Sequence, residues 1–522
     1  MMTRDPNGTF RARWALAALA ALGFVLGACS SDSGASLDGG GDDDDTADAT
    51  PGAPDGAAAD APPGTPDAAE VDAPPGTPDA AEAIADAEPP EPPDAHPLPP
   101  DAHPLPPDAH PAPPDAAPPH PDAAPPPQPD ASVPPPIGHP FGTHTPYCAQ
   151  GVIFPSNHTR AQLDAQVASF YDAWKARYIK TGCVAGQFRI KTSPSTDDYT
   201  VSEGHGYAML VTVIMQGHDP NAKATYDGLY RYFRGHPSSN NPQLMAWAQS
   251  SSCANVDGPD SATDGDLDIA YSLLLADKQW GSDGAINYHA EAVAMIAGIL
   301  VGEIHPANTI LVGDWANDSG DEHYTGTRPS DFMVNHFKAY AAASGVARWT
   351  GVVDKTYQIV SYLQDHASPN TGLIPDFVVN ATGNTPAPAP SGWLEGSSDG
   401  KYGYNSCRVP WRIATDYLVS CDTRSQTAVR KLNSWIRSTT GDNPDSIKDG
   451  YNLSGSATGS DPDLCFVAPF GVSAMVQPAS GTNQPWLNAV WDYAADQGVD
   501  QYYEDSVKLL SMIVMSGNWW AP

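Results

Sequence analysis

The sequence predicts an all-α domain: an (α/α) barrel of six helical hairpins, preceded by a signal peptide and a disordered linker rich in Pro, Asp and Ala. Apolar residues recur at spacings of three and four in twelve segments between residues 158 and 516. Polar, Gly-rich and Pro-rich connections separate these segments, and no strand pattern is strong enough to oppose helices. Twelve helices within residues 138–522 suggest six hairpins closed into a ring.

Residues 1–28 resemble the signal peptide of a bacterial lipoprotein. A short apolar run, 12–28, follows Arg4, Arg11 and Arg13, and it is too short for a typical membrane span. It ends in Leu-Gly-Ala-Cys, which resembles a lipobox and implies that Cys29 becomes lipidated. We therefore expect an exported protein, held at the outer membrane or cell surface by lipid, or secreted if ordinary signal cleavage occurs instead.

Residues 29–137 predict a disordered linker. The unit DAPPGTPDAAE occurs twice, at 60–70 and 72–82, and large apolar side chains are almost absent. Such a segment buries too little surface to offset its conformational entropy, and its prolines favour an extended chain.

Charge and cysteine content narrow the function of the remaining domain, 138–522. Of the 62 acidic residues, 24 precede residue 138, against 3 of the 26 basic ones, so the domain itself is also acidic. This argues against nucleic acid as a partner and suits a neutral or cationic polymer. Six cysteines follow Cys29 without a C-x-x-C pair, so we expect up to three disulfides in an exported chain and no zinc site. We also expect a monomer.

The twelve helical segments follow one another along the whole domain. Each is expected to extend to within a few residues of its apolar pattern. In chain order they are 158–178, 203–217, 221–234, 264–279, 285–303, 329–344, 347–366, 408–421, 423–440, 463–477, 482–496 and 500–516. The connections have unequal lengths, and a binding groove is expected on the rim that carries the long ones.

The segment DGDLD begins the fourth helix with Asp264, Asp266 and Asp268. A calcium-binding EF-hand is excluded, because its sixth and twelfth positions would hold Ile269 and Leu275 in place of Gly and Glu. Acids at a helix start are favoured by the helix dipole and by capping, but this does not explain why there are three.

Glu203 lies at the first turn of another apolar helix, in TVSEGHGYAMLV. One interpretation is a capping glutamate after Ser202. The other is a carboxyl group presented to a groove, where Gly204 and Gly206 let a substrate approach the backbone closely.

Together these stretches resemble the family 8 glycoside hydrolases. The motif A-T-D-G-D-x-x-I-A-x-S-L-L-x-A-x-x-x-W, 262–280, is similar to the family signature, and S-E-G-H-G-Y, 202–207, to the segment that carries the general acid. The resemblance covers about residues 145–518. It implies that Glu203 is the general acid and that Asp264 holds the distorted sugar. Asp266 and Asp268 are then expected to cap the helix or to bond to neighbouring backbone.

The sequence departs from the commoner family pattern at Asn405. Many members have an aspartate general base there, and an amide cannot take a proton from water. The resemblance is then to a subgroup, including chitosanases and lichenase-type β-glucanases, whose base is a glutamate in an inserted loop. Glu395, in SGWLEGSSDG beside Trp393, fits that role, and Asp399 is the competing candidate.

Inversion, which the family resemblance implies, needs a water between base and sugar. The two carboxyl groups are then expected ~6.5–9.5 Å apart, with environments that push their pKa values apart. No metal or cofactor is required. Side chains that stack on or bind sugar are also expected, with core packing as the alternative for the aromatic ones. They are Trp247, Trp315, Tyr404, Tyr503 and Asn405.

Arg408 and Arg412, in CRVPWR, either orient the catalytic carboxylates or pair within the barrel. Arg408 is also included among the expected substrate-binding residues. The predicted function is an endo-acting inverting glycoside hydrolase that cleaves β-1,4 linkages. Its substrate stays open between chitosan, modestly favoured by the acidic domain, and β-glucan or cellulose. The alternative is a non-catalytic polysaccharide-binding surface lipoprotein with the same fold.

Overall fold

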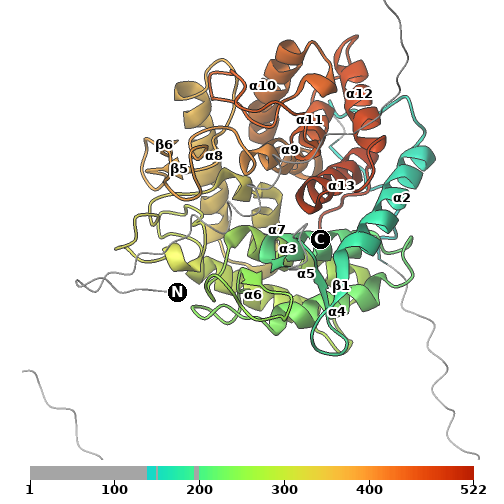
Figure 1. Ribbon diagram of the computed structural model, residues 1–522, viewed down its shortest axis with the longest axis vertical. Coiled ribbons are helices and arrows are strands. Elements are labelled where there is room, and N and C mark those ends of the chain that lie inside the picture. Colours follow the sequence, from blue (N-terminus) through green and yellow to red (C-terminus); the bar gives the residue numbers. More distant parts are fainter. Residues whose placement is uncertain (1–137, 149–150, 193–198) are drawn as a thin grey trace, which may run out of the picture. The chain divides into compact units, whose positions relative to one another are not determined.

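The computed structural model describes residues 138–148, 151–192 and 199–522 (Figure 1). The predicted signal peptide, the predicted linker and Cys29 lie outside the described residues.

Six helices form an inner ring in which each contacts the next and the last contacts the first. Helix α3 shows why they lie inside, because twelve of its thirteen residues are buried and a helix that is apolar all round belongs in a core. The inner helices are α3 (Ser202–Ile214), α5 (Thr263–Trp280), α7 (Val334–Ser344), α9 (Val409–Ser420), α11 (Leu464–Met475) and α13 (Tyr502–Ser516).

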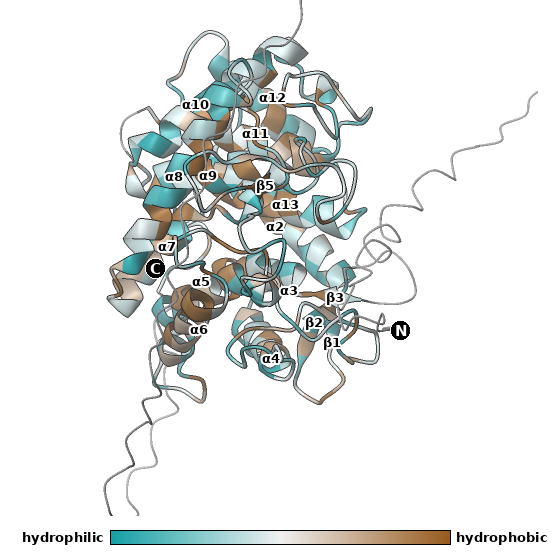
Figure 2. Ribbon diagram, turned by 90° about the vertical axis from the view of Figure 1, so that its left-hand side faces the viewer, coloured by the Kyte–Doolittle hydropathy of each residue, from teal (hydrophilic) through white to brown (hydrophobic). Residues whose placement is uncertain are grey.

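Six further helices pack outside this ring, each mainly against the inner helix that is its hairpin partner or neighbour. In Figure 2 the inner helices α5, α9 and α11 carry much brown, whereas α8 and α10 carry teal as well. The outer helices are α2 (Arg160–Tyr178), α4 (Ala222–Arg234), α6 (Tyr288–Gly302), α8 (Arg348–His366), α10 (Thr423–Thr440) and α12 (Asn483–Ala495). The described residues therefore form the (α/α) barrel of six hairpins that the sequence predicts.

Connection lengths differ between the two ends of the barrel. Most connections from an outer helix to the next inner one are long, such as 235–262, 303–333 and 367–408, although 496–501 is short. Connections from an inner helix to its outer partner are short, as at 345–347 and 421–422. Because paired helices are antiparallel, the N-termini of all six inner helices lie at the end with the long connections, where their dipoles favour carboxylates.

The helix boundaries agree with the predicted segments to within a few residues. The clearest difference is at the segment predicted from 329, where Pro329–Asp331 is a 3₁₀ turn, η3, and α7 begins only at Val334. Further 3₁₀ turns are η2 (Asp314–Ala316), η4 (Ser406–Arg408) and η5 (Pro444–Ser446).

Short antiparallel strand pairs, all in the long connections, are the only named strands of the described residues. They add local rigidity to these connections without forming a further layer. The pairs are β1 (Ile179–Thr181) with β2 (Phe188–Ile190), β3 (Thr200–Val201) with β4 (Ala248–Gln249), and β5 (Val378–Val379) with β6 (Ala387–Pro388).

Two disulfides form, out of the three that the sequence allowed. Cys148 joins Cys421, and Cys183 joins Cys253. Cys407 and Cys465 are buried thiols. Across the described ranges, none of the helices is both long enough and apolar enough to cross a membrane.

Candidate active site

Glycines bring the starts of α3 and α5 close together. A Cβ at Gly265 would lie 2.4 Å from the backbone of Ser202, and one at Gly206 would lie 2.7 Å from Asp268. A Cβ at Gly204 would lie 2.5 Å from the hydroxyl of Tyr502. The prediction that Gly204 and Gly206 admit a substrate was therefore wrong: these glycines admit neighbouring helices.

Glu203 is held by side chains from two other inner-ring segments. Tyr502, at the start of α13, donates to its Oε1 at 2.8 Å, and Arg408 donates to its Oε2 at 2.6 Å. The side chain of Glu203 is 18% exposed. It is not a capping glutamate, because the residue before α3, Val201, has no side-chain cap and the bonds of Glu203 go to side chains.

The environment of Glu203 favours a carboxyl group that keeps its proton. Burial raises the pKa of Glu203, and the nearby Asp264 adds to this, whereas Arg408 and Tyr502 oppose it. The net direction is upward. This direction suits a group that must donate a proton.

Asp264 lies beside Glu203 but keeps its charge. Burial alone would raise its pKa, yet Arg328 and Arg408 together lower the pKa of Asp264 below its ordinary value. Arg328 Nη2 lies 2.8 Å from Oδ1, and Arg408 Nη1 donates to Oδ2 at 3.1 Å. Its Oδ1 also accepts from the N–H of Gly265 at 2.9 Å. Two neighbouring carboxyl groups thus have pKa values moved in opposite directions.

The other two aspartates of DGDLD have structural partners. Asp266 accepts from the backbone N–H of Met245 at 2.9 Å, as expected for a bond to neighbouring backbone. Asp268 instead accepts from Arg412 at 2.5 and 2.8 Å and lies 2.9 Å from His336. The capping expectation was wrong for Asp268, because a fully buried carboxylate needs a cation more than a backbone donor.

Arg408 organises the centre of the site. It is 1% exposed, and its guanidinium also donates to Ser330 at 2.9 Å and to Asn405 Oδ1 at 2.9 Å. With its donors satisfied by protein groups, Arg408 holds side chains in place and is not placed to bind sugar directly. Both alternatives for the two arginines therefore occur: Arg408 orients carboxylates, and Arg412 pairs within the barrel.

Asn405 connects Arg408 to Glu395. Its side-chain oxygen accepts from Arg408, and its Nδ2 donates to Glu395 Oε2 at 2.8 Å. Burial of the carboxyl group raises the pKa of Glu395, while Arg328 and the Asn405 amide oppose the rise. As a residue, Glu395 is nevertheless exposed. The pKa values of Glu203 and Glu395 thus move in the same direction in the free protein, contrary to the expectation that they diverge.

Asp399, the competing candidate for the base, is occupied by its own loop. It is 2% exposed and accepts from the backbone N–H groups of Leu394 at 2.8 Å, Glu395 at 3.2 Å and Gly396 at 2.8 Å. A carboxylate with three such bonds has little capacity left for water or substrate. Asp399 fixes the backbone that carries Glu395.

A small second apolar cluster lies beneath this loop. Trp393 packs at 5.5 Å from Phe377 and at 4.8 Å from His323, whose Nε2 lies 2.9 Å from the Trp393 carbonyl oxygen. Gly326 leaves room for the indole, because a Cβ there would lie 2.2 Å from the Trp393 ring. Trp393 is therefore an anchor of the loop.

The remaining predicted aromatic residues divide between the surface and the core. Trp247 and Trp315 are half-buried in the long connections, and the backbone oxygen of Trp247 accepts from Ser202 at the start of α3. Trp315 lines a cavity of about 380 Å³ with Asn240 and Asp318 among its other walls. Tyr404 donates to Asp463 at 2.6 Å and its carbonyl accepts from Tyr503, so both are built into the barrel end.

Two residues of the site, Arg328 and Tyr502, were not predicted by the sequence analysis. Arg328, which pairs with Asp264 and with Asp331, stands in an ordinary loop sequence. The sequence analysis predicted Tyr503 as a sugar-binding residue, whereas its neighbour Tyr502 is the one that bonds to Glu203. The sequence offers one hint of Arg328: it stands three residues before Asp331, and a buried arginine requires a nearby acid. Across the described ranges, no three His, Cys, Asp or Glu side chains gather as a metal site would need.

Comparisons with known proteins identify the family of this chain. Residues 156–517 match the profile of Glycosyl hydrolases family 8. The chain is 52% identical over 382 residues to a β-glucanase of Niallia circulans, covering 73% of this chain and 91% of the relative. It is 32% identical to endoglucanase A of Acetivibrio thermocellus, covering 73% and 74% respectively.

Among solved structures, the fold resembles the apo structure of a β-1,3-1,4-glucanase from Paenibacillus sp. X4. The TM-score is 0.71 at 50% identity, and the match covers 74% of this chain and all of the other. A cold-adapted family 8 xylanase shares the fold at 18% identity, with a TM-score of 0.57. The chain therefore belongs to family 8 of the glycosyl hydrolases.

Proposed function

We propose that this glycoside hydrolase cleaves β-1,4 bonds inside a β-glucan chain with inversion, using Glu203 as general acid and Glu395 as general base. The observation that carries the proposal is the bridge between these two residues. One guanidinium, Arg408, and one amide, Asn405, connect the carboxyl group on α3 to the carboxyl group on the loop.

The acid step follows from the surroundings of Glu203. Its raised pKa keeps the carboxyl group protonated closer to neutral pH, so that it can protonate the leaving oxygen of the glycosidic bond. Tyr502 donates to Oε1 when Glu203 is ionised, and its hydroxyl can accept when Glu203 is protonated. Both protonation states therefore keep their hydrogen bonds.

The base step uses the carboxylate of Glu395, an exposed residue of the long loop. It takes a proton from a water molecule that attacks the anomeric carbon on the face opposite the leaving group, which requires room between the carboxyl groups. The Asn405 amide donates to this carboxylate and so favours its ionised form. An asparagine thus assists the base at the position where the family resemblance implies an aspartate base in many members.

Asp264 supplies a fixed negative charge beside the acid. Its lowered pKa keeps it ionised while Glu203 is protonated. A carboxylate at this place stabilises the positive charge that develops on the sugar as the bond breaks.

The names of the similar proteins support β-glucan as substrate over chitosan. The test is reducing-sugar release from mixed-linkage β-1,3-1,4-glucan, carboxymethylcellulose and chitosan, assayed in parallel. The highest kcat/KM is expected on a β-glucan. Chitosan as the best substrate would overturn the substrate assignment, and activity on none of the three would favour the non-catalytic alternative.

We also propose export of a monomeric enzyme with lipidation at Cys29, on the lipobox-like sequence before it. Cys29→Ser is expected to move the protein from the membrane fraction to the soluble fraction, without a change in kcat on the preferred glucan. An unchanged membrane fraction would contradict the lipid anchor.

A further inference from the structure

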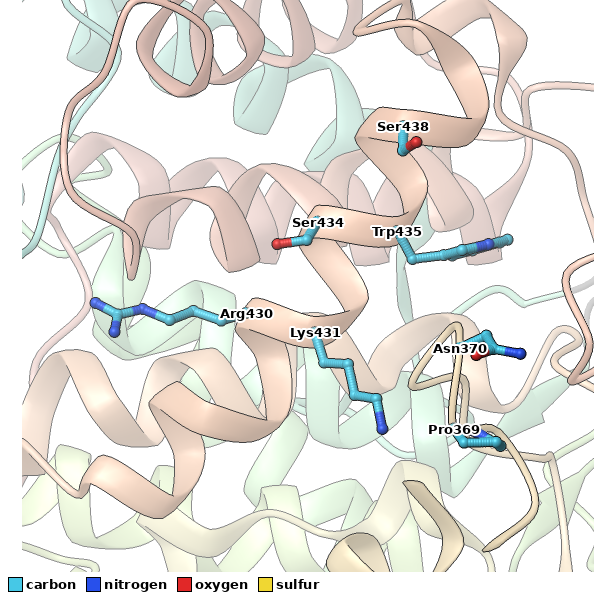
Figure 3. A pocket seen from close by; sticks show the side chains of 7 residues that line it. All are labelled: Pro369, Asn370, Arg430, Lys431, Ser434, Trp435 and Ser438. Atoms are coloured by element: carbon cyan, nitrogen blue, oxygen red, sulfur yellow. The ribbon is translucent and has the colours of Figure 1, made fainter. Parts of the chain in front are cut away.

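A second cavity, of about 560 Å³, opens on the outside of the barrel along α10 (Figure 3). None of Glu203, Asp264 and Glu395 belongs to it. Its lining comes from one face of α10 and from the turn that follows α8: Pro369, Asn370, Arg430, Lys431, Ser434, Trp435 and Ser438.

Trp435 gives this cavity a fixed aromatic wall. The indole is half-buried and meets Tyr451 edge to face, with ring centroids 5.0 Å apart. A Cβ at Gly455 would lie 3.0 Å from the indole nitrogen, so the following loop also touches the ring. Figure 3 shows the ring extending from α10 on the side where Pro369 and Asn370 lie. The ring is therefore held in one orientation before any ligand binds.

The two cations of the lining are bound to the protein main chain. Arg430 Nε donates to the carbonyl of Val476 at 3.1 Å, and Lys431 Nζ donates to the carbonyl of Gln364 at 2.6 Å. No acidic residue lines the cavity. What it offers to a ligand is an aromatic ring together with the exposed amide of Asn370 and the exposed hydroxyl of Ser438.

We propose that this cavity is a second binding site for a neutral β-glucan strand, which extends the proposed function and rests on it. Sugar rings pack their C–H faces on indole, and their hydroxyl groups bond to amides and hydroxyls. The volume lies within the range of small-ligand sites, and the spacing of Lys431, Trp435 and Ser438 along α10 lines one helix face. With no acid in the lining, the site binds glucan and does not cleave it.

The test uses the full chain in the Glu203→Gln background, so that bound sugar is not hydrolysed. Titration calorimetry with a mixed-linkage β-glucan tetrasaccharide is expected to give two sites. Adding Trp435→Ala is expected to weaken one of them at least tenfold, ~1.4 kcal/mol, and to leave the other unchanged. A single site in both proteins, or a second site unaffected by Trp435→Ala, would overturn the proposal.

Two further variants separate binding from folding. Asn370→Ala removes an exposed side chain and is expected to weaken the same site several-fold without a change in melting temperature. Tyr362→Ala is the matched control, because this residue is a half-buried aromatic on α8 that stacks on His366 and lies outside the cavity. An equal effect of Tyr362→Ala would contradict the assignment to Trp435. Residual hydrolysis by Glu203→Gln alone would count against the proposed acid and not against this site.

Discussion

Glu203 begins a buried helix of the inner ring, whereas Glu395 projects from residues 367–408, the longest of the described connections between helices. The helix start is fixed by tight packing at Gly204, Gly206 and Gly265. The loop is fixed by one buried carboxylate, Asp399, and by a small apolar cluster under Trp393. The acid is thus placed by the core of the fold, and the base by a local structure that can change without disturbing the barrel.

Glu203→Gln should have the largest effect on catalysis, because it removes the acid that the core of the fold holds in place. The amide keeps an oxygen for Tyr502 or Arg408 but cannot donate a proton to the leaving group, so kcat should fall by ~10²–10⁴-fold. The melting temperature should change little, because the glycine contacts remain. Steady-state kinetics on the preferred glucan decide the matter, and a kcat within a few-fold of the unmodified enzyme would refute the role of Glu203.

Asp399→Asn should disturb the loop alone. The replaced oxygen leaves at least one of three backbone N–H groups unpaired and lets Glu395 move, so kcat should fall by ~10–100-fold with little change in KM. The acid limb of the pH profile should persist, because Glu395 remains the base. Loss of that limb would instead identify Asp399 as the base.

Asp422→Asn is the matched control for this variant. Asp422 also accepts a backbone N–H, that of Arg424, but at the start of α10 at the opposite end of the barrel. Its replacement should leave kcat unchanged. An equal loss of kcat would show that removing any buried or capping carboxylate slows the enzyme.

Asn405→Ala should have the smallest effect, because it removes only the amide that joins Arg408 to Glu395. Burial already raises the pKa of Glu395, and the Asn405 amide opposes this by donating to the carboxylate. Without the amide the pKa rises further. Since the base must be ionised, the acid limb of kcat/KM should move to higher pH. A limb that stays in place or moves to lower pH would contradict the role of the amide.

The sequence predicted the helices and the carboxylates Glu203 and Asp264 at the starts of two of them, because both follow from local patterns. The apolar period located every helix of the barrel, and the motifs around Glu203 and Asp264 lie at helix starts that the packing fixes. Local patterns could not predict the pairing of Arg328 with Asp264, because the two residues are distant in sequence. They also could not predict that Asp399 accepts hydrogen bonds from the backbone of its own loop. Those facts depend on how a long loop folds against the barrel end.

The most direct test of the account is the activity of Glu395→Ala with and without azide. The variant keeps the barrel, Glu203 and Asp264, so it should fold and bind glucan yet lose turnover by ~10²-fold or more. Azide, which needs no base, should attack in place of the activated water and restore part of the rate. Rescue of Glu395→Ala, together with no rescue of Glu203→Gln on the same glucan, is the predicted result. Turnover of Glu395→Ala near that of the unmodified enzyme would show that the base lies elsewhere.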